Sequence, residues 1–140
     1  ILDIKLPHLE DYNKKRREAA RYYNRGFKNN PNIVTPTTQK CGEICDTCDC
    51  HVFHQYTLQI TNGKRDALHQ HLNELQIPNA IYYPVALHKQ KAYEDDRYKE
   101  SDFVVTNELV KTVISLPMHT ELEKEQQDYI IKTILDFVGA

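Results

Sequence analysis

The stretch "HVFHQYTLQI", residues 51–60, decides the fold class of this chain. Apolar side chains recur in it at every second position, as in a strand that buries one face. The side chains expected on the more apolar face are Val52, His54, Tyr56, Leu58 and Ile60. Those expected on the opposite face are Phe53, Gln55 and Thr57. We therefore predict a strand over residues 51–60, which the pair Asn62-Gly63 ends with a turn.

A long helix is predicted before this strand, over residues 7–25. Pro7 suits an early helical position, where its missing N–H is not needed, and Gly26 is expected to stop the helix. The apolar or amphipathic positions recur at spacings of three and four, on Leu9, Tyr12, Arg16, Ala19, Ala20 and Tyr23. Residues 28–50 hold two prolines and many Asn, Thr and Asp, so they are expected to be mostly loop.

Helices and strands alternate after residue 63. One helical face is marked by Ala67, Leu68, His71, Leu72 and Leu75, and Pro78 closes that segment. The elements expected next are a short strand at about 79–83, a charged loop at 84–101, a helix at 102–112 and a strand at 113–117.

A final helix is predicted at the end of the chain. Thr120 and Glu123 have the spacing of a capping box at its start. Its apolar stripe is expected to be Leu122, Tyr129, Ile130, Ile134 and Phe137. Three strands with interleaved helices predict one α+β (α/β) domain over residues 1–140, although the pattern leaves strand directions open.

Composition excludes several function classes. The formal net charge is −2 and the signs are interspersed, so no broad basic surface indicates nucleic-acid binding. No apolar run approaches the roughly 20 residues of a membrane helix, and Asp3 and Lys5 interrupt the only apolar start, so a cytoplasmic protein is expected. The single methionine is Met118, and the chain starts at Ile1. We therefore expect a piece of a longer protein, cut on its N-terminal side.

Four cysteines raise the possibility of a metal site. Cys41, Cys45, Cys48 and Cys50 fall within ten residues, and Cys45-x-x-Cys48 has the spacing of a zinc knuckle. Structural zinc sites normally use two separated pairs, and this cluster does not repeat the spacing. Reduced surface thiols are the simpler interpretation, and a zinc-binding interaction module remains the alternative.

The segment "IYYPVALHKQKAY", residues 81–93, is the better candidate for a binding site. The end of a strand fixed by Pro84 would place the Tyr82 and Tyr83 side chains precisely, and a tyrosine hydroxyl can bind a phosphate or a sugar. The period of a strand sends adjacent residues to opposite faces, so one of the two is expected to be structural. His54 has a similar ambiguity, because a histidine on an apolar face is more often bonded to backbone. Motifs of serine hydrolases, phosphate loops and zinc proteases are absent.

Three segments together resemble the DegT/DnrJ/EryC/StrS family of sugar-nucleotide aminotransferases. They are "KLPHLEDYNKKRREAARYYNRGF" (5–27), "HVFHQYTLQI" with "KRDALHQHLNELQIPNAIYYPVALHKQKAY" (51–60 and 64–93), and "VISLPMHTELEKEQQDYIIKTI" (113–134). The resemblance covers nearly the whole chain except the cysteine-rich loop. It implies the small C-terminal domain of a fold type I aminotransferase, whose large domain binds pyridoxal phosphate. Such enzymes move an amino group from glutamate to a keto-sugar of dTDP or UDP, and they act as homodimers.

The resemblance also implies what this chain lacks and what it supplies. No lysine here stands in the Schiff-base motif of the family, so the cofactor is expected on a missing upstream domain and the fragment alone is expected to be inactive. The residues that match the substrate side of the family are Tyr82, Tyr83, His54, Tyr56 and His88. A module that only binds zinc or a sugar nucleotide remains the alternative.

Overall fold

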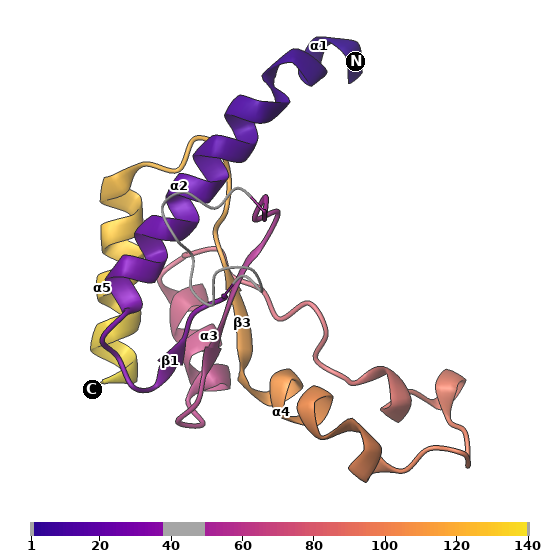
Figure 1. Cartoon of the computed structure of the whole chain (residues 1–140). Helices are drawn as coiled ribbons and strands as arrows, with labels where there is room; N and C mark the ends of the chain where they lie inside the picture. Colours follow the sequence, from indigo (N-terminus) through magenta and orange to yellow (C-terminus); the bar gives the residue numbers. More distant parts are fainter. Residues whose placement is uncertain (1, 38–49, 140) are drawn as a thin grey trace.

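The centre of the fold is a three-stranded antiparallel sheet. The computed structural model describes residues 2–37 and 50–139 (Figure 1). Its strands are β1 (Ile33–Val34), β2 (Tyr56–Ile60) and β3 (Val113–Leu116), with β2 in the middle. Tyr56 pairs with Leu116 across β2 and β3, and Ile33 pairs with Ile60 across β1 and β2. The described residues thus form an α+β unit, as predicted.

Helices make up most of the remaining described chain. The α-helices are α1 (Leu2–Lys5), α2 (Leu9–Phe27), α3 (Arg65–Glu74), α4 (Val104–Thr112) and α5 (Lys124–Val138). The 3-10 turns are η1 (Leu6–His8), η2 (Leu87–Lys89), η3 (Lys91–Tyr93) and η4 (Glu100–Phe103). Figure 1 shows α2 beside α5, the first turns of α2 reaching beyond the body, and residues 84–103 running out on another side with α4.

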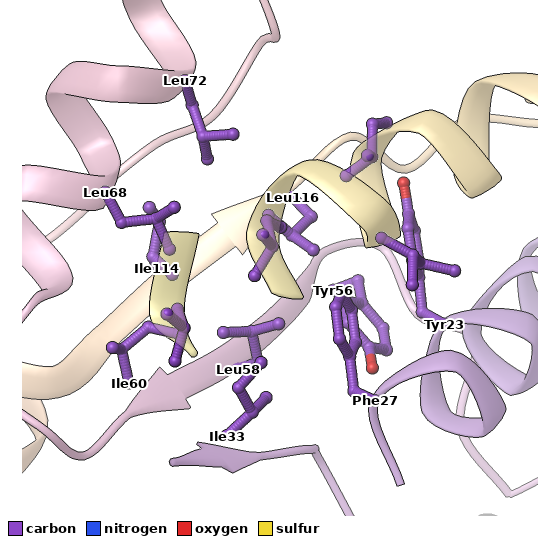
Figure 2. Packing of buried hydrophobic residues seen from close by; sticks show 14 of the residues in the cluster. Tyr23, Phe27, Ile33, Tyr56, Leu58, Ile60, Leu68, Leu72, Ile114 and Leu116 are labelled. Carbon is purple, nitrogen blue, oxygen red and sulfur yellow. The ribbon is translucent and has the colours of Figure 1, made fainter. Parts of the chain in front are cut away.

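One hydrophobic core joins the sheet to the helices (Figure 2). Tyr56, Leu58 and Ile60 alternate along β2 and are each buried, so this strand presents one face to the core. The helical residues packed against that face are Tyr23 and Phe27 of α2, Leu68 and Leu72 of α3, and Ile130 and Ile134 of α5. Each such side chain contributes roughly 1.5–3 kcal/mol by leaving water, which makes this core the main source of stability.

The strand predicted over residues 51–60 begins later than expected. Phe53 has φ +49, a left-handed conformation that a strand cannot contain. The backbone turns there, so Phe53 is buried in the core while Val52 and His54 are exposed. The predicted facing of these three residues was therefore wrong, and only Tyr56–Ile60 keeps the alternation of a strand.

The prediction of a strand at 79–83 was also wrong. Only Ala80 pairs with the sheet, through a single bridge to Ser115 with N–O distances of 3.0 and 2.9 Å. Pro78 and Pro84 lie on either side of this bridge and offer no backbone N–H to extend it. The third strand is instead β1, inside the segment predicted to be loop.

The ends of two helices differ from the sequence prediction. Gly26 does not stop α2, which continues to Phe27. The predicted Thr120–Glu123 capping box is wrong, because α5 starts three residues later and the Glu123 N–H donates to Oε1 of Gln126 at 3.0 Å.

The apolar stripe predicted for the last helix is largely confirmed. Ile130 and Ile134 are buried, and Phe137 packs against the core from a partly buried position. Leu122 also packs against the core, but it lies before α5 begins at Lys124, which corrects that member of the helical stripe. Tyr129 is exposed, which corrects that member of the stripe.

The N-terminal end of the described chain exposes apolar side chains. Leu2, Ile4 and Leu6 are 83, 75 and 65% exposed, and Leu9 and Tyr12 of α2 are exposed as well. The start of the described chain therefore carries an exposed apolar surface. No helix within 2–37 or 50–139 is both long enough and apolar enough to cross a membrane.

Candidate functional site

A hollow of about 190 Å³ lies at the edge of the sheet, where three distant segments meet. We call it the strand-edge hollow. The segment before β2, the segment around the Ala80 bridge and the end of β3 line it. Its lining residues are His54, Gln55, Pro78, Asn79, Ala80, Tyr82, Ser115, Leu116, Pro117 and Met118. The hollow therefore combines aromatic, amide and hydroxyl groups, a lining suited to a polar ligand with a flat or ring-shaped part.

His54 reaches this hollow from the turn that Phe53 creates. Nη1 of Arg16 lies 3.3 Å from Nδ1 of His54. A guanidinium group only donates, so Nδ1 accepts this hydrogen bond and the imidazole proton stands on Nε2. His54 thereby keeps one N–H that can donate to a ligand oxygen.

The two adjacent tyrosines are placed differently. Tyr82 lines the hollow and is 55% exposed, whereas Tyr83 is 78% exposed and is not among the lining residues. Both lie in the loop after the Ala80 bridge, so neither is fixed in the core. Of the pair, the geometry favours Tyr82 as a ligand contact.

Tyr56 does not share this exposure. Its side chain is fully buried, and its hydroxyl donates to Oδ1 of Asn24 at 2.6 Å. Burial raises the pKa of the Tyr56 phenol, with a smaller contribution from neighbouring Tyr23. The centroid of the Tyr56 ring lies 4.9 Å from that of the Tyr23 ring. Tyr56 was expected to contact the substrate, but none of its surface is exposed in the described structure. The residue packs in the core instead.

His88 lines a second hollow, of about 630 Å³, which we call the loop hollow. Its ring stacks on Phe103 with 4.2 Å between centroids, and its Nε2 is buried without a hydrogen-bond partner in the described chain. The other lining residues are Leu87, Ala92, Tyr93, Glu94, Asp95, Tyr98 and Thr106. The predicted site residues are thus divided, with His54 and Tyr82 at one hollow and His88 at the other.

Ion pairs hold the exposed segment around the loop hollow. Hydrogen bonds from Arg97 lower the pKa of Asp95, and the hydrogen bond from the Lys89 ammonium lowers the pKa of Glu100. All four side chains lie near the surface, where such pairs contribute little to stability because water and salt screen them. These pairs shape the segment and supply no evident catalytic group.

Sequence reasoning missed Asn79 and Ser115 as members of the site. Ser115 is buried, its Oγ lies 2.7 Å from Oγ1 of Thr57, and its backbone bonds Ala80. A serine in an otherwise apolar strand is a weak signal that a polar partner lies opposite. Asn79 gave a clearer one, because a polar residue directly after Pro78 often fixes a turn.

The lining of the two hollows does not fit pyridoxal phosphate. Neither hollow is lined by a lysine, and the strand-edge hollow has no carboxylate, so the groups that would hold this cofactor are not supplied there. Within residues 2–37 and 50–139, no three His, Cys, Asp or Glu side chains cluster as metal ligands. Cys41, Cys45 and Cys48 lie outside the described residues, and Cys50 is exposed.

Known proteins match this chain over nearly its full length. Residues 1–135 match the model of the DegT/DnrJ/EryC1/StrS aminotransferase family. The chain is 37% identical over 98% of its length to a pleiotropic regulatory protein of Geobacillus stearothermophilus, covering 35% of that protein. It is 33% identical over 96% of its length to the dTDP-3-amino-3,6-dideoxy-alpha-D-galactopyranose transaminase of Aneurinibacillus thermoaerophilus, covering 34% of it.

A solved structure is similar to this chain in both fold and sequence. A DegT DnrJ EryC1 StrS aminotransferase from Brucella abortus superimposes with a TM-score of 0.83 and 33% identity. The match covers 100% of this chain and 35% of that one. The chain thus spans about a third of the length of the relatives it matches.

Proposed function

Because this chain belongs to the DegT/DnrJ/EryC1/StrS aminotransferase family, we propose that it is the substrate-side domain of a sugar-nucleotide aminotransferase. In this proposal a large domain upstream holds pyridoxal phosphate, and the present chain closes over the sugar. The amino group moves from glutamate to a keto-sugar linked to dTDP or UDP. The glutamate donor, the homodimer and the cytoplasmic location belong to the same proposal.

The observation that carries the proposal is the meeting of Tyr82 and His54 at the strand-edge hollow. These two side chains line a space of about 190 Å³, smaller than the roughly 300 Å³ at which drug-sized pockets begin. A hollow of this size fits one sugar ring or one phosphate group and leaves the remainder of a nucleotide sugar outside it. That size supports a pocket completed by residues beyond this chain.

Tyr82 and His54 have separate tasks in the proposed reaction. The Tyr82 hydroxyl donates to a sugar or phosphate oxygen, and its ring packs against the sugar face. The Nε2–H of His54, left free by the bond from Arg16, donates to a second oxygen. Pyridoxal phosphate, when bound elsewhere, supplies the amino-transfer chemistry, while these side chains bind and orient the substrate.

A pair of alanine variants tests this assignment in the full-length protein. Tyr82→Ala should raise the KM for a dTDP- or UDP-linked keto-sugar by about tenfold, the effect of losing one contact worth roughly 1.4 kcal/mol. Tyr83→Ala is the matched control, because the neighbouring ring does not line the hollow. Equal effects of the two substitutions would contradict the assignment, and a full-length protein that transfers no amino group would contradict the function.

A protein that binds the nucleotide sugar without transferring an amino group is the second outcome of this test. It would show an effect of Tyr82→Ala on sugar-nucleotide binding but no formation of 2-oxoglutarate from glutamate. The zinc-module alternative rests on cysteines that are mostly outside the described residues, and elemental analysis of the purified protein tests it directly.

A further inference from the structure

A closed ring of three side chains joins α3 to the segment that enters the strand-edge hollow. His69 and Asn73 lie one turn apart on α3, and Asn79 follows Pro78. Nδ1 of His69 contacts Oδ1 of Asn79, and Nδ2 of Asn79 lies 2.9 Å from Oδ1 of Asn73. Nδ2 of Asn73 completes the ring at 3.3 Å from Nε2 of His69.

A backbone carbonyl fixes the direction in which this ring donates. The Asn79 nitrogen also lies 3.0 Å from the carbonyl oxygen of Ile77, which can only accept. The amide of Asn79 therefore cannot be turned over, and its oxygen faces His69. Nδ1 of His69 must then carry the proton, and Nε2 must accept from Asn73. All three bonds are made only by a neutral His69 in this one tautomer.

The ring and the sheet hold the same short segment from two sides. Asn79 belongs to the ring, and the next residue, Ala80, makes both backbone bonds to Ser115 of β3. Tyr82 follows two residues later, and Asn79, Ala80, Tyr82 and Ser115 all line the hollow. Asn79 is half-buried and Tyr82 is exposed, so the residue held by hydrogen bonds is less accessible than the residue proposed to contact a ligand.

We propose that His69, Asn73 and Asn79 are positioning residues for the nucleotide sugar, an inference that rests on the proposed function. The ring sets the path of residues 77–82 and so the position of the Tyr82 hydroxyl at the hollow. His69 and Asn73 do not line the hollow. Their effect on the ligand passes through Asn79.

Binding of a nucleotide sugar to the full-length protein tests the positioning role. Asn79→Asp keeps the size of the side chain but removes the donor to Ile77 and Asn73. Two hydrogen bonds that hold the segment are lost, and the dissociation constant should rise at least about fivefold, with dTDP-glucose and UDP-N-acetylglucosamine as probes. The control is Gln70→Ala, an exposed α3 residue whose amide bonds Glu74 outside the ring.

Nitrogen NMR of histidine-labelled protein tests the ring itself without any ligand. At about pH 8, where an ordinary imidazole is neutral, His69 should show a protonated Nδ1 and an unprotonated Nε2. In Asn73→Asp the new carboxylate can only accept, so Nε2 should become protonated. The thermal unfolding midpoint of each variant is measured alongside, which separates a local change from a loss of fold.

The outcomes separate the two proposals. A wild-type His69 protonated on Nε2, or an Asn73→Asp signal identical to wild type, overturns the ring. If the wild type binds a probe, and Asn79→Asp and Gln70→Ala change its dissociation constant equally, the positioning role is overturned. A wild type that binds neither probe overturns the proposed function, while the nitrogen signals still report on the ring.

Discussion

Gly26 of α2 lies directly against Ile131 of α5. A Cβ atom built on Gly26 would stand 2.6 Å from Cδ1 of Ile131 and about 3 Å from two further carbons of the same side chain. Real Cβ atoms do not approach other atoms so closely. The glycine therefore allows the two helices to pack at this point, and its role is close approach rather than the helix stop that its position near residue 25 predicts.

Gly26→Ala should destabilise the protein. Alanine gains about 1 kcal/mol over glycine within a helix, but overpacking a tight core contact costs about 1–3 kcal/mol. The buried, β-branched Ile131 has little freedom to move aside, so the cost should exceed the gain. Urea denaturation of the variant measures the balance. A variant more stable than wild type would show that the helices separate easily.

The double substitution Gly26→Ala/Ile131→Val identifies the contact responsible. Valine removes Cδ1, the atom closest to the new methyl group. Ile131→Val alone should cost about 0.5–1.5 kcal/mol, and the pair should cost less than the sum of the two single changes. Strict additivity would mean that the clash is relieved elsewhere.

Tyr56→Phe should lower stability although the hydroxyl is a small part of the side chain. The substitution leaves Oδ1 of Asn24 without its donor, at a cost of about 1–2 kcal/mol in the free energy of unfolding. Tyr83→Phe is the matched control, since that ring is largely exposed and should change stability by less than about 0.5 kcal/mol. Urea denaturation measures both variants, and similar denaturation midpoints would contradict the contribution of the buried hydrogen bond.

Alkaline pH should destabilise the fold through two buried phenols. Burial raises the pKa of Tyr23 and of Tyr56 above the ordinary value near 10. Above about pH 10 the unfolded chain releases these protons while the folded chain keeps them, so the free energy of unfolding falls as pH rises. Denaturation at several pH values in wild type and Tyr56→Phe checks this. A slope that the substitution leaves unchanged would assign the effect to other groups.

The apolar N-terminal surface should make the isolated chain self-associate. Leu2, Ile4 and Leu6 are exposed close together along the chain, and Leu9 that follows them is exposed as well. Sedimentation should show oligomers at high concentration, and Leu2→Lys/Leu6→Lys should reduce them. Val104→Lys/Val105→Lys, an equally exposed pair on α4, tests whether the effect is specific to this end. A monodisperse wild-type monomer would contradict the prediction.

Local patterns predicted most elements and failed where distant residues decide. The alternation in β2, the spacing in α3 and α5 and the mostly apolar residues of β3 are local signals, and the structure confirms that these segments form the predicted elements. Ala67 and Leu75 of the predicted α3 face are nevertheless exposed. The two residues of β1 form a strand only because Ile33 meets Ile60, a pairing that no neighbouring residue specifies. Likewise, the left-handed backbone at Phe53 keeps β2 from beginning earlier in the chain, although phenylalanine favours strands.

The candidate site was only half accessible to sequence reasoning. Tyr82 and His54 were predicted by their residue types, but their meeting depends on the Ala80–Ser115 bridge. Tyr56 belongs to the same motif as His54, and only the turn at Phe53 explains why one is exposed and the other buried. The ring of His69, Asn73 and Asn79 joins a helix to a loop and has no pattern of its own along the sequence.

Amino transfer by the full-length protein tests the central claim most directly. The protein, loaded with pyridoxal phosphate, is mixed with glutamate and then with a dTDP- or UDP-linked keto-sugar, while the visible absorption of the cofactor is followed. We predict that glutamate bleaches this band, that the keto-sugar restores it, and that Tyr82→Ala slows only the second step. A band that glutamate leaves unchanged, or that no nucleotide-linked keto-sugar restores, would contradict the account.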